Sequence, residues 1–328
     1  MVTESVAESL IREGDLMLNA VLTDLMQISA IEVVVFRDAN MPHVQWINNA
    51  QALTIILIEN QEAFHRSWDD LVQSCDAVWP IAPETDGILE KLSRDVENSG
   101  KLLLSCSSEV VRQTASKHNT LRILEEHGIP VVPTNRLSRS PVESIPPWVI
   151  KPDDGVGCEG SCTVFCEEDL DRFYSDMGME NFIIQPLVDG KPCSLSVLFK
   201  QGTAVLLSCN HQCVTYHDRS IQLIGCNVNA VKDIDGKFAS LATQIATAFP
   251  SLWGYAGIDL IVTEENILVL EINPRLTTSY AGLASALGIN VAEMILAGHV
   301  GMGNFVPTKA KHGRSVFISL QSDNEYEY

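Results

Sequence analysis

The sequence is short of positive charge. Its 328 residues include 22 lysines and arginines against 42 aspartates and glutamates, a formal net charge of −20 at pH 7. A nucleic-acid-binding surface needs clustered Lys and Arg to displace counterions, so this composition argues against nucleic acid as a partner. A phosphate ligand would have to be held by a few local cations, by backbone amides and by a metal ion.

Long hydrophobic runs are also missing. The aliphatic stretch Leu53–Ile58 is far too short to span a bilayer, and the opening residues Met-Val-Thr-Glu-Ser-Val lack the basic region of a signal peptide. The hydrophobic fraction of 46% is nevertheless that of a globular chain. These features predict a cytoplasmic protein without a membrane partner.

The sequence shows neither a disulfide pattern nor a recognisable covalent nucleophile. Its nine cysteines are an odd number and are scattered, which favours free thiols in a reducing compartment. Cys209 and Cys213 flank His211, but their spacing matches no common zinc knuckle. No Ser-His-Asp or Cys-His arrangement stands out, so the chemistry is expected to proceed without a side-chain nucleophile.

What is present is concentrated in residues 254–275. Two runs of β-branched and aliphatic residues flank a polar Thr-Glu-Glu-Asn break, which predicts a β-hairpin. Polar side chains interrupt its strands at three places, Asp259, Glu271 and Asn273. A three-residue turn at 264–266, with its last residue in the left-handed region, would set Asp259 opposite Glu271.

These polar side chains must be neutralised, because a carboxylate on a core-facing strand costs too much free energy to stay unpaired. Glu271 and Asn273 are two residues apart and therefore share one face of their strand. Two carboxylates and an amide oxygen form a hard, oxygen-only ligand set that suits magnesium. The alternative interpretation is a buried salt bridge, such as one from Glu271 to Arg275, at the end of a core hairpin.

The N-terminal third alternates strands with helices, which indicates a parallel α/β layer. One or two amphipathic helices, broken near Gly14, are expected between residues 4 and 25. Further strands are expected at 31–36, 53–58, 76–79 and 102–105, and further helices at 61–73, 86–98 and 108–127. Glu84 lies just past the end of one strand, where it could orient a substrate amine. Alternatively, this segment only caps the next helix through Asp86.

A glycine-rich loop, 153–160, lies between two predicted strands. Gly155, Gly157 and Gly160 match the spacing of the dinucleotide fingerprint, but a strand follows where that fingerprint requires a helix. No lysine follows the last glycine, which excludes a Walker P-loop. Such a loop can lay backbone amides over nucleotide phosphates, and Lys151 just before it favours this interpretation over a plain hairpin turn.

The hairpin ending in Glu-Ile-Asn-Pro-Arg275, together with Lys151 and the glycine loop, resembles the ATP-grasp ligases over about residues 108–300. The resemblance implies an α/β protein in which an N-terminal parallel α/β domain precedes two α+β lobes that sandwich ATP. The implied divisions are an N-terminal domain at 1–107, a lid subdomain at 108–190, a magnesium-binding subdomain at 191–310 and a tail at 311–328.

The resemblance also implies a role for each motif residue. It makes Arg275 and Lys151 the catalytic residues, acting on the transferring phosphoryl group and on the ATP phosphates. The implied ligands of magnesium, or of manganese in its place, are Asp259, Glu271 and Asn273. The implied nucleotide-binding residues are Lys117, Lys151, Gly155, Gly157, Gly160, Gln185, Leu187, Val188 and Asp189.

In that nucleotide set, Gln185 would meet the base edge, while the backbone of Leu187 and Val188 would form the hydrogen bonds to adenine. Asp189 would replace the glutamate that usually grips the ribose, since Lys-Pro-Cys-Ser stands in its place. Lys117 is equally compatible with an ordinary solvated helix residue. The implied substrate-binding residues, before a predicted helix whose N-terminus could bind a carboxylate, are Thr277, Thr278 and Ser279, along with Glu84.

Several N-terminal residues narrow the resemblance. Glu13-Gly14, Met17-Leu18, Asp24 and Ala82-Pro-Glu-Thr resemble the tyramine–glutamate ligases of methanofuran biosynthesis and their methylotroph relatives. The implied reaction joins the γ-carboxyl of glutamate to tyramine or a related aromatic amine, through an acyl phosphate, and releases ADP and phosphate. The alternatives are an ATP-grasp ligase of other specificity and a nucleotide-binding regulator without catalysis. A homodimer is left open.

Overall fold

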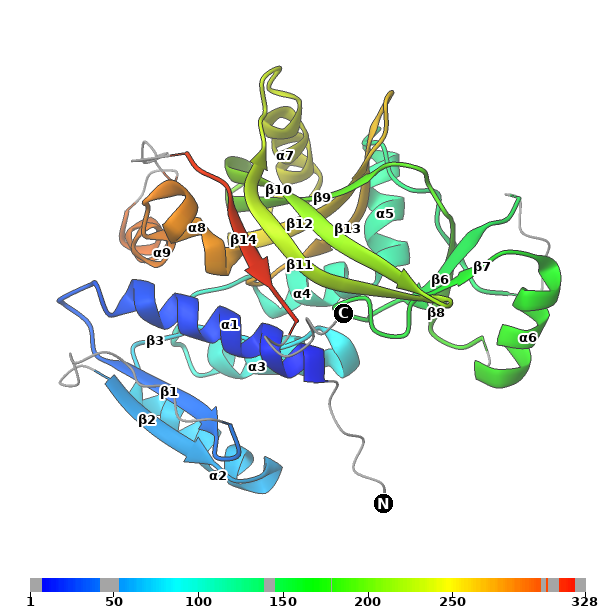
Figure 1. Cartoon of the computed structure of the whole chain (residues 1–328). Helices are drawn as coiled ribbons and strands as arrows, with labels where there is room; N and C mark the ends of the chain where they lie inside the picture. The colour runs from blue at the N-terminus through cyan, green and yellow to red at the C-terminus, as the bar shows by residue number, and fades with distance from the viewer. Residues whose placement is uncertain are drawn as a thin grey trace.

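The N-terminal part of the chain consists of two parallel strand pairs with helices packed against them (Figure 1). The computed structural model describes residues 8–41, 53–138, 145–177, 179–301, 305 and 313–321. The first elements are α1 (Glu8–Leu25), β1 (Val33–Asp38), β2 (Leu53–Ile58), α2 (Gln61–Ser74), β3 (Ala77–Val78), η1 (Thr85–Gly87), α3 (Ile88–Asn98) and β4 (Leu102–Leu103). β1 pairs with β2 and β3 with β4, both in parallel, which confirms the predicted parallel α/β layer.

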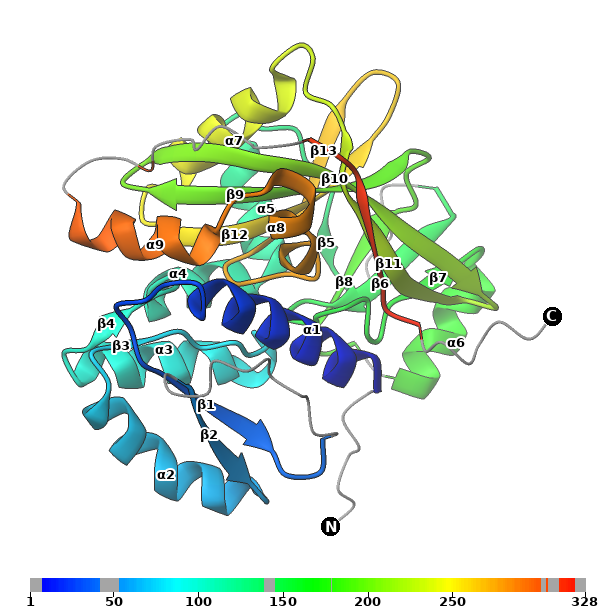
Figure 2. The same ribbon diagram turned by 60° about the vertical axis from the view of Figure 1, so that its left-hand side comes forward.

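Helix α1 runs without interruption through Gly14, so the predicted break there is wrong. A glycine inside a helix costs about 1 kcal/mol relative to alanine, and packing on two sides of α1 offsets this cost. Met17 and Val21 enter the core formed with α8 (Tyr280–Leu287), whereas Leu22 packs against β1. α1 therefore lies between the N-terminal strands and the rest of the molecule (Figure 2).

The segment predicted as one helix, 108–127, forms two helices, α4 (Ser108–Ala115) and α5 (Lys117–Glu126). Ser116 breaks them apart, because its hydroxyl accepts from the N–H of Asn119 and donates to Asp153 at 2.7 Å. A serine that caps a helix in this way favours a new helix start over continuation of the old one. The break brings Lys117 to the first position of α5, where its side chain is buried.

The rest of the chain forms one large antiparallel sheet with helices on it. Its elements are β5 (Asn135–Arg136), β6 (Trp148–Pro152), β7 (Cys162–Val164), α6 (Glu167–Met177), β8 (Phe182–Pro186), β9 (Lys191–Lys200), β10 (Thr203–His217), β11 (Ser220–Val231), α7 (Lys237–Ala248), β12 (Gly254–Val262), β13 (Ile267–Asn273), α8, α9 (Val291–Val300) and β14 (Val316–Ser319). The strand order is β13-β12-β9-β10-β11-β7-β6-β8-β5, and β14 pairs with β11. The segment 311–328, predicted as a tail, thus contributes a strand to the sheet.

Strand β9 separates two differently used faces of this sheet. Leu195 and Val197 point into the core formed with α4, α5 and α7. Ser194 points the other way, into a cavity, and further along the same face Leu198 meets the α8–α9 core. Because both faces are covered, β9 is buried over most of its length.

The described helices differ from a membrane-spanning helix in length or composition. None of them is by itself both long and apolar enough to cross a bilayer. Helix α8 and residues 291–299 of α9 reach that length and composition only as a pair, bent by 102°.

A buried carboxylate ties α1 to α8. Asp24 is 3% exposed, and its Oδ2 accepts a hydrogen bond of 2.8 Å from the hydroxyl of Tyr280. No Lys, Arg or His of the described chain forms an ion pair with it. Burial raises the pKa of Asp24 to about 6, although the hydrogen bonds from Tyr280 and from backbone N–H groups oppose the rise.

We expect Asp24→Asn to gain stability relative to the wild type as the pH rises. The folded state keeps the Asp24 proton up to about pH 6, whereas the ordinary pKa is 3.8, so the wild type loses stability between these values as pH increases. The difference in free energy of unfolding, variant minus wild type, should grow by about 2 kcal/mol between about pH 4.5 and about pH 7.5. Urea unfolding at both pH values measures it. Asp70→Asn, at an exposed position of α2, is the matched control, and a pH-independent difference for Asp24→Asn would refute the assignment.

Candidate active site

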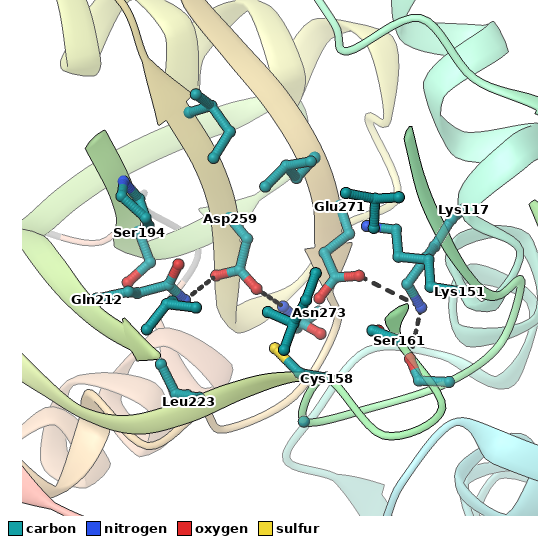
Figure 3. Close-up of a pocket in the computed structure, with 18 of the residues that line it drawn as sticks. Lys117, Lys151, Cys158, Ser161, Ser194, Gln212, Leu223, Asp259, Glu271 and Asn273 are labelled. Carbon is teal, nitrogen blue, oxygen red and sulfur yellow. Dashed lines mark hydrogen bonds and ion pairs between the residues drawn. The ribbon is translucent and has the colours of Figure 1, made fainter. Parts of the chain in front are cut away.

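A cavity lies between the glycine-rich loop joining β6 to β7 and the face of β9–β13 that carries Asp259 (Figure 3). The predicted residues that line it are Lys117, Lys151, Gly155, Gly157, Gln185, Leu187, Val188, Asp259, Glu271, Asn273, Arg275, Thr277, Thr278 and Ser279. Gly160 stands at the end of the loop just outside this lining. Asp189 and Glu84 do not line the cavity, and only Glu84 is connected to it by a contact described below.

The hairpin sets Asp259 opposite Glu271, as predicted, but by a different route. Val262 pairs with Ile267, so the connection is the four-residue loop 263–266 rather than a three-residue turn, and its last residue is not left-handed. Continued without a break, that register would place Asp259 opposite Leu270. A bulge at Leu270 shifts the pairing by one residue and turns Glu271 and Asn273 toward Asp259.

The two carboxylates share a cavity with two lysines. Lys117 Nζ lies 3.3 Å from Glu271 Oε2, and Lys151 faces the same carboxylate (Figure 3). Burial alone would raise the pKa of Glu271, but Lys117 and Lys151 outweigh it and hold the pKa at about 2. Burial and the negative charge of Glu271 raise the pKa of Asp259 well above its usual value.

Asp259 is held by two amide groups. Its Oδ1 accepts from Gln212 Nε2 at 2.9 Å, and its Oδ2 accepts from Asn273 Nδ2 at 3.2 Å. Asp259 and Glu271 repel each other, and this repulsion helps to raise the pKa of Asp259. A hard divalent cation would relieve the repulsion, and two carboxylates with an amide oxygen are ligands that suit it. Asp259, Glu271 and Asn273 therefore fit a magnesium ion.

Arg275 and Glu84 form a buried ion pair across 191 residues of sequence, with Arg275 Nε 2.8 Å from Glu84 Oε2. Arg275 Nη1 also donates to the carbonyl of Leu276 at 3.0 Å. The alternative interpretation of the hairpin, a salt bridge from Glu271 to Arg275, is thus wrong in its pairing. Among the described atoms, Glu84 Oε1 is buried without a hydrogen-bond partner.

The glycine loop is anchored at its base and touches the N-terminal layer at its tip. Asp153 accepts from the N–H of His118 at 2.8 Å, which fixes the base of the loop at the start of α5. At the tip, Asp154 accepts from the N–H of Asp86, while Thr85 donates to the Asp154 carbonyl. Gly157 has a φ of +60°, and a Cβ there would lie 3.0 Å from Leu10 Cδ2 of α1. Helix α1 and η1 therefore support the loop in this position.

The backbone amides of this loop are available to a ligand. Within the described chain, the N–H groups of Gly155, Gly157 and Gly160 donate to no protein acceptor. Lys117 Nζ donates to the carbonyl of Gly155, so the lysine reaches both the loop and Glu271. The Lys117 side chain is also buried, which rules out the alternative that it is a solvated helix residue.

The proposed adenine end of the cavity agrees only in part with the prediction. Gln185 is 2% exposed, and its Nε2 donates to Thr134 at 2.7 Å. The N–H of Leu187 donates to the carbonyl of Pro147 at 2.9 Å, so only the carbonyl of Leu187 remains for a base. Asp189 is exposed and lies outside the cavity lining, which corrects its assignment as the ribose-binding residue.

The hydroxyl groups after Arg275 are joined in a buried network. The Tyr255 hydroxyl lies 3.0 Å from Thr277 Oγ1 and 3.2 Å from Ser279 Oγ. Gly257 leaves the space that the Thr277 side chain fills, since a Cβ there would lie 2.5 Å from its methyl group. Thr278 instead donates to Glu13 Oε2 at 3.1 Å.

Sequence reasoning assigned no site role to Glu13 or Gln212, both of which line the cavity. A signal for Glu13 was present, because it lies on the inward stripe of α1 between Leu10 and Met17, where a carboxylate is unexpected. Gln212 had no such signal, since a polar residue inside a strand is common on a half-exposed face.

Comparison with known proteins places this chain in a family. Residues 114–279 match the model of an ATP-grasp domain, and residues 31–111 match that of a pre-ATP-grasp domain. The chain is 26% identical over 293 residues to a tyramine–L-glutamate ligase of Methanocaldococcus jannaschii, covering 88% of this chain and 83% of the relative.

Solved structures agree on the fold. An ATP-grasp superfamily protein from Archaeoglobus fulgidus aligns with a TM-score of 0.71 at 22% identity, over 96% of this chain and 88% of that one. The biotin carboxylase domain of 2-oxoglutarate carboxylase from Hydrogenobacter thermophilus, in complex with MgADP, ADP and bicarbonate, aligns with a TM-score of 0.69 at 14% identity, over 90% and 69%.

We expect Glu271→Gln to abolish most turnover while the fold persists. Loss of this charge removes one ligand of the candidate metal site and the partner of Lys117. Loss of a residue that only contacts a metal ligand typically lowers activity roughly tenfold to a hundredfold. The loss in kcat/KM for Glu271→Gln should be larger than this. Glu264→Gln, exposed in the turn of the same hairpin, is the matched control. Steady-state ADP release measures both, and near-normal activity of Glu271→Gln would show the metal assignment to be wrong.

We also expect nucleotide with magnesium to slow amide hydrogen exchange in residues 154–160. The unpaired glycine amides there would gain phosphate acceptors. Exchange measured by mass spectrometry, with residues 263–266 as an internal reference loop, tests this. Equal protection with and without nucleotide would reduce the loop to a structural turn.

Proposed function

The chain belongs to the ATP-grasp family and is an ADP-forming carbon–nitrogen ligase, and we propose that it joins glutamate to tyramine or another aromatic amine. The product would serve the biosynthesis of a one-carbon carrier of the methanofuran type. The name of the M. jannaschii relative supports this choice of substrates. ATP would be consumed, and ADP and phosphate released.

One observation carries the proposal. Unpaired glycine amides, Lys117 and Lys151 converge from one side of the cavity on Asp259 and Glu271 at the other side. This arrangement is suited to a triphosphate, because cations and amides hold its oxygens while carboxylates hold the accompanying metal ion. No Ser, Cys or His of the described cavity lining is activated by a neighbouring base; burial raises the pKa of the Cys158 thiol to about 12.

Magnesium is the ion that this donor set favours, and Asp259, Glu271 and Asn273 would hold it. When bound, it would neutralise phosphate charge and polarise the phosphoryl oxygens. The neighbour crystallised with MgADP supports the same nucleotide and metal here. Gln212 would keep Asp259 oriented by the hydrogen bond already described.

The reaction would proceed by direct attack of the donor carboxylate. One carboxylate oxygen of glutamate bonds to the γ-phosphorus as the bond to ADP breaks, giving an acyl phosphate. Once its ammonium form has given up one proton, the amine nitrogen bonds to the acyl carbon, the carbon–oxygen bond to phosphate breaks, and the nitrogen loses a second proton.

Arg275 would act on the phosphoryl oxygens, since it lines the cavity while Glu84 holds its Nε. This assignment gives Glu84 an orienting function for Arg275. It differs from the earlier expectation that Glu84 binds the substrate amine.

Oxygen-18 labelling tests the reaction. With glutamate labelled in its carboxyl groups, one label should pass to inorganic phosphate for each amide formed, because the attacking oxygen stays on phosphorus. Mass spectrometry of the phosphate measures the transfer, and chromatography identifies ADP. Unlabelled phosphate together with AMP would instead indicate adenylate chemistry and overturn the proposal.

A further inference from the structure

Glu13 is a carboxylate of the cavity lining whose pKa is raised by burial, a rise that the nearby positive charge of Arg275 opposes. Its Oε2 accepts from Thr278 at 3.1 Å, and its Oε1 lies against the loop at Gly157. Within the described chain, it forms no ion pair with Lys, Arg or His. A half-buried carboxylate with a single hydroxyl partner leaves room for a ligand that carries positive charge.

The other charges around it are already matched. Arg275, the nearest cation, is held by Glu84 at 2.8 Å, and Lys117 is held by Glu271 at 3.3 Å. Asp259 takes two amide donors and belongs to the candidate metal set. Glu13 therefore has a place of its own, on α1 at the N-terminal side of the cavity, and does not belong to the ion pairs of these residues.

Side chains of β10 and β11 form one wall of the cavity, and this wall becomes more apolar along the strands away from Gln212. Three cross-strand pairs line the cavity in order, namely Gln212 with Cys226, Val214 with Leu223 and Tyr216 with Ile221. The first pair is polar and touches Asp259 through Gln212, whereas the other two are apolar or aromatic. Tyr216 lines the cavity and is 57% exposed.

Glu13 lines the same cavity as this wall, and its charge reaches Cys226 in the pair at the Asp259 end. Burial raises the pKa of the Cys226 thiol to about 12, with smaller contributions from Cys213 and from the nearby Glu13 carboxylate. Leu223 continues the wall from there and, like Cys158 of the loop, lines the cavity (Figure 3). A molecule with a cationic head on Glu13 would thus lay an apolar body on Val214 and Leu223.

We propose that Glu13 and the β10–β11 wall form the subsite of the amine substrate, with the ammonium group on Glu13 and the hydrocarbon or aryl body on Val214, Leu223, Tyr216 and Ile221. This rests on the proposed ligase function and specifies the class of acceptor, a primary amine with an apolar body. We assign this wall to the amine and not to glutamate, because an amino acid needs a partner for its own α-carboxylate, and no Lys or Arg among the described residues lies on this wall.

The test is Glu13→Gln, which keeps the shape and removes the charge. The KM for tyramine should rise roughly tenfold to a hundredfold, while the KM for glutamate and for ATP stays within about twofold. Formation of glutamyl hydroxamate from hydroxylamine, a small nucleophile that is largely neutral, should persist. Glu125→Gln, exposed on α5, is the matched charge control.

Three further variants separate recognition from folding. Glu13→Asp keeps the charge and should recover part of the tyramine affinity. Leu223→Ala should weaken the binding of tyramine but not that of ethylamine, and Leu223→Met should restore the binding of tyramine. In the wild type, tyramine should bind more tightly than tyrosol, which carries a hydroxyl in place of the ammonium, and Glu13→Gln should lose that preference.

The outcomes distinguish the subsite from the reaction. A raised KM for glutamate with an unchanged KM for tyramine, or no change in either, would overturn the subsite. Absence of both amide and hydroxamate in the wild type would instead refute the proposed function. In that case calorimetric titration with tyramine tests the subsite directly, because Glu13→Gln should bind tyramine at least roughly tenfold more weakly than the wild type does. Equal binding by the two proteins would overturn the assignment.

Discussion

The structure depends on the burial of two carboxylates, Asp259 and Glu271, at paired positions of one hairpin. Such a pair is unfavourable in a cavity unless positive charge and hydrogen-bond donors surround it. Lys117 and Lys151 come to it from α5 and β6, and Gln212 comes from β10. Three separate parts of the chain therefore meet at this pair of carboxylates and stabilise it by charge and hydrogen bonding. The cavity lies where they meet.

The N-terminal layer belongs to the same charge system. Glu84 holds Arg275 by a buried ion pair, and Glu13 accepts from Thr278. Removal of one partner of a buried ion pair would leave the other uncompensated, so this layer and the hairpin are coupled energetically as well as in space. The position of α1 between the two halves of the molecule follows from this coupling and from its two apolar faces (Figure 2).

The glycine loop connects packing to the expected motion of the site. Gly157 and Gly160 take backbone conformations with φ of +60° and +68°, which residues with side chains rarely adopt. The loop tip contacts η1 through Asp154 and approaches α1 at Gly157, so it bridges the lobes without a large apolar interface. We expect contacts of this kind to be weak enough for the loop to open for a nucleotide.

Most of the elements and the central hairpin could be predicted from the sequence, because periodicity and turn chemistry depend on neighbours along the chain. The pairing of Asp259 with Glu271 was predicted correctly, yet it depends on a bulge at Leu270 that local propensity does not reveal. Ser116 likewise splits a predicted helix, because its hydroxyl finds Asp153, a residue distant in sequence.

The sequence by itself determined the alternation of strands and helices, the oxygen-rich ligand set and the glycine loop, since each is encoded within a short segment. Only the tertiary structure decided which charges meet. Glu84 pairs with Arg275 across 191 residues, and Glu13 reaches Thr278 across 265. Electrostatic partners are chosen by distance in space, which depends on how whole layers pack, and a linear pattern carries little information about that packing.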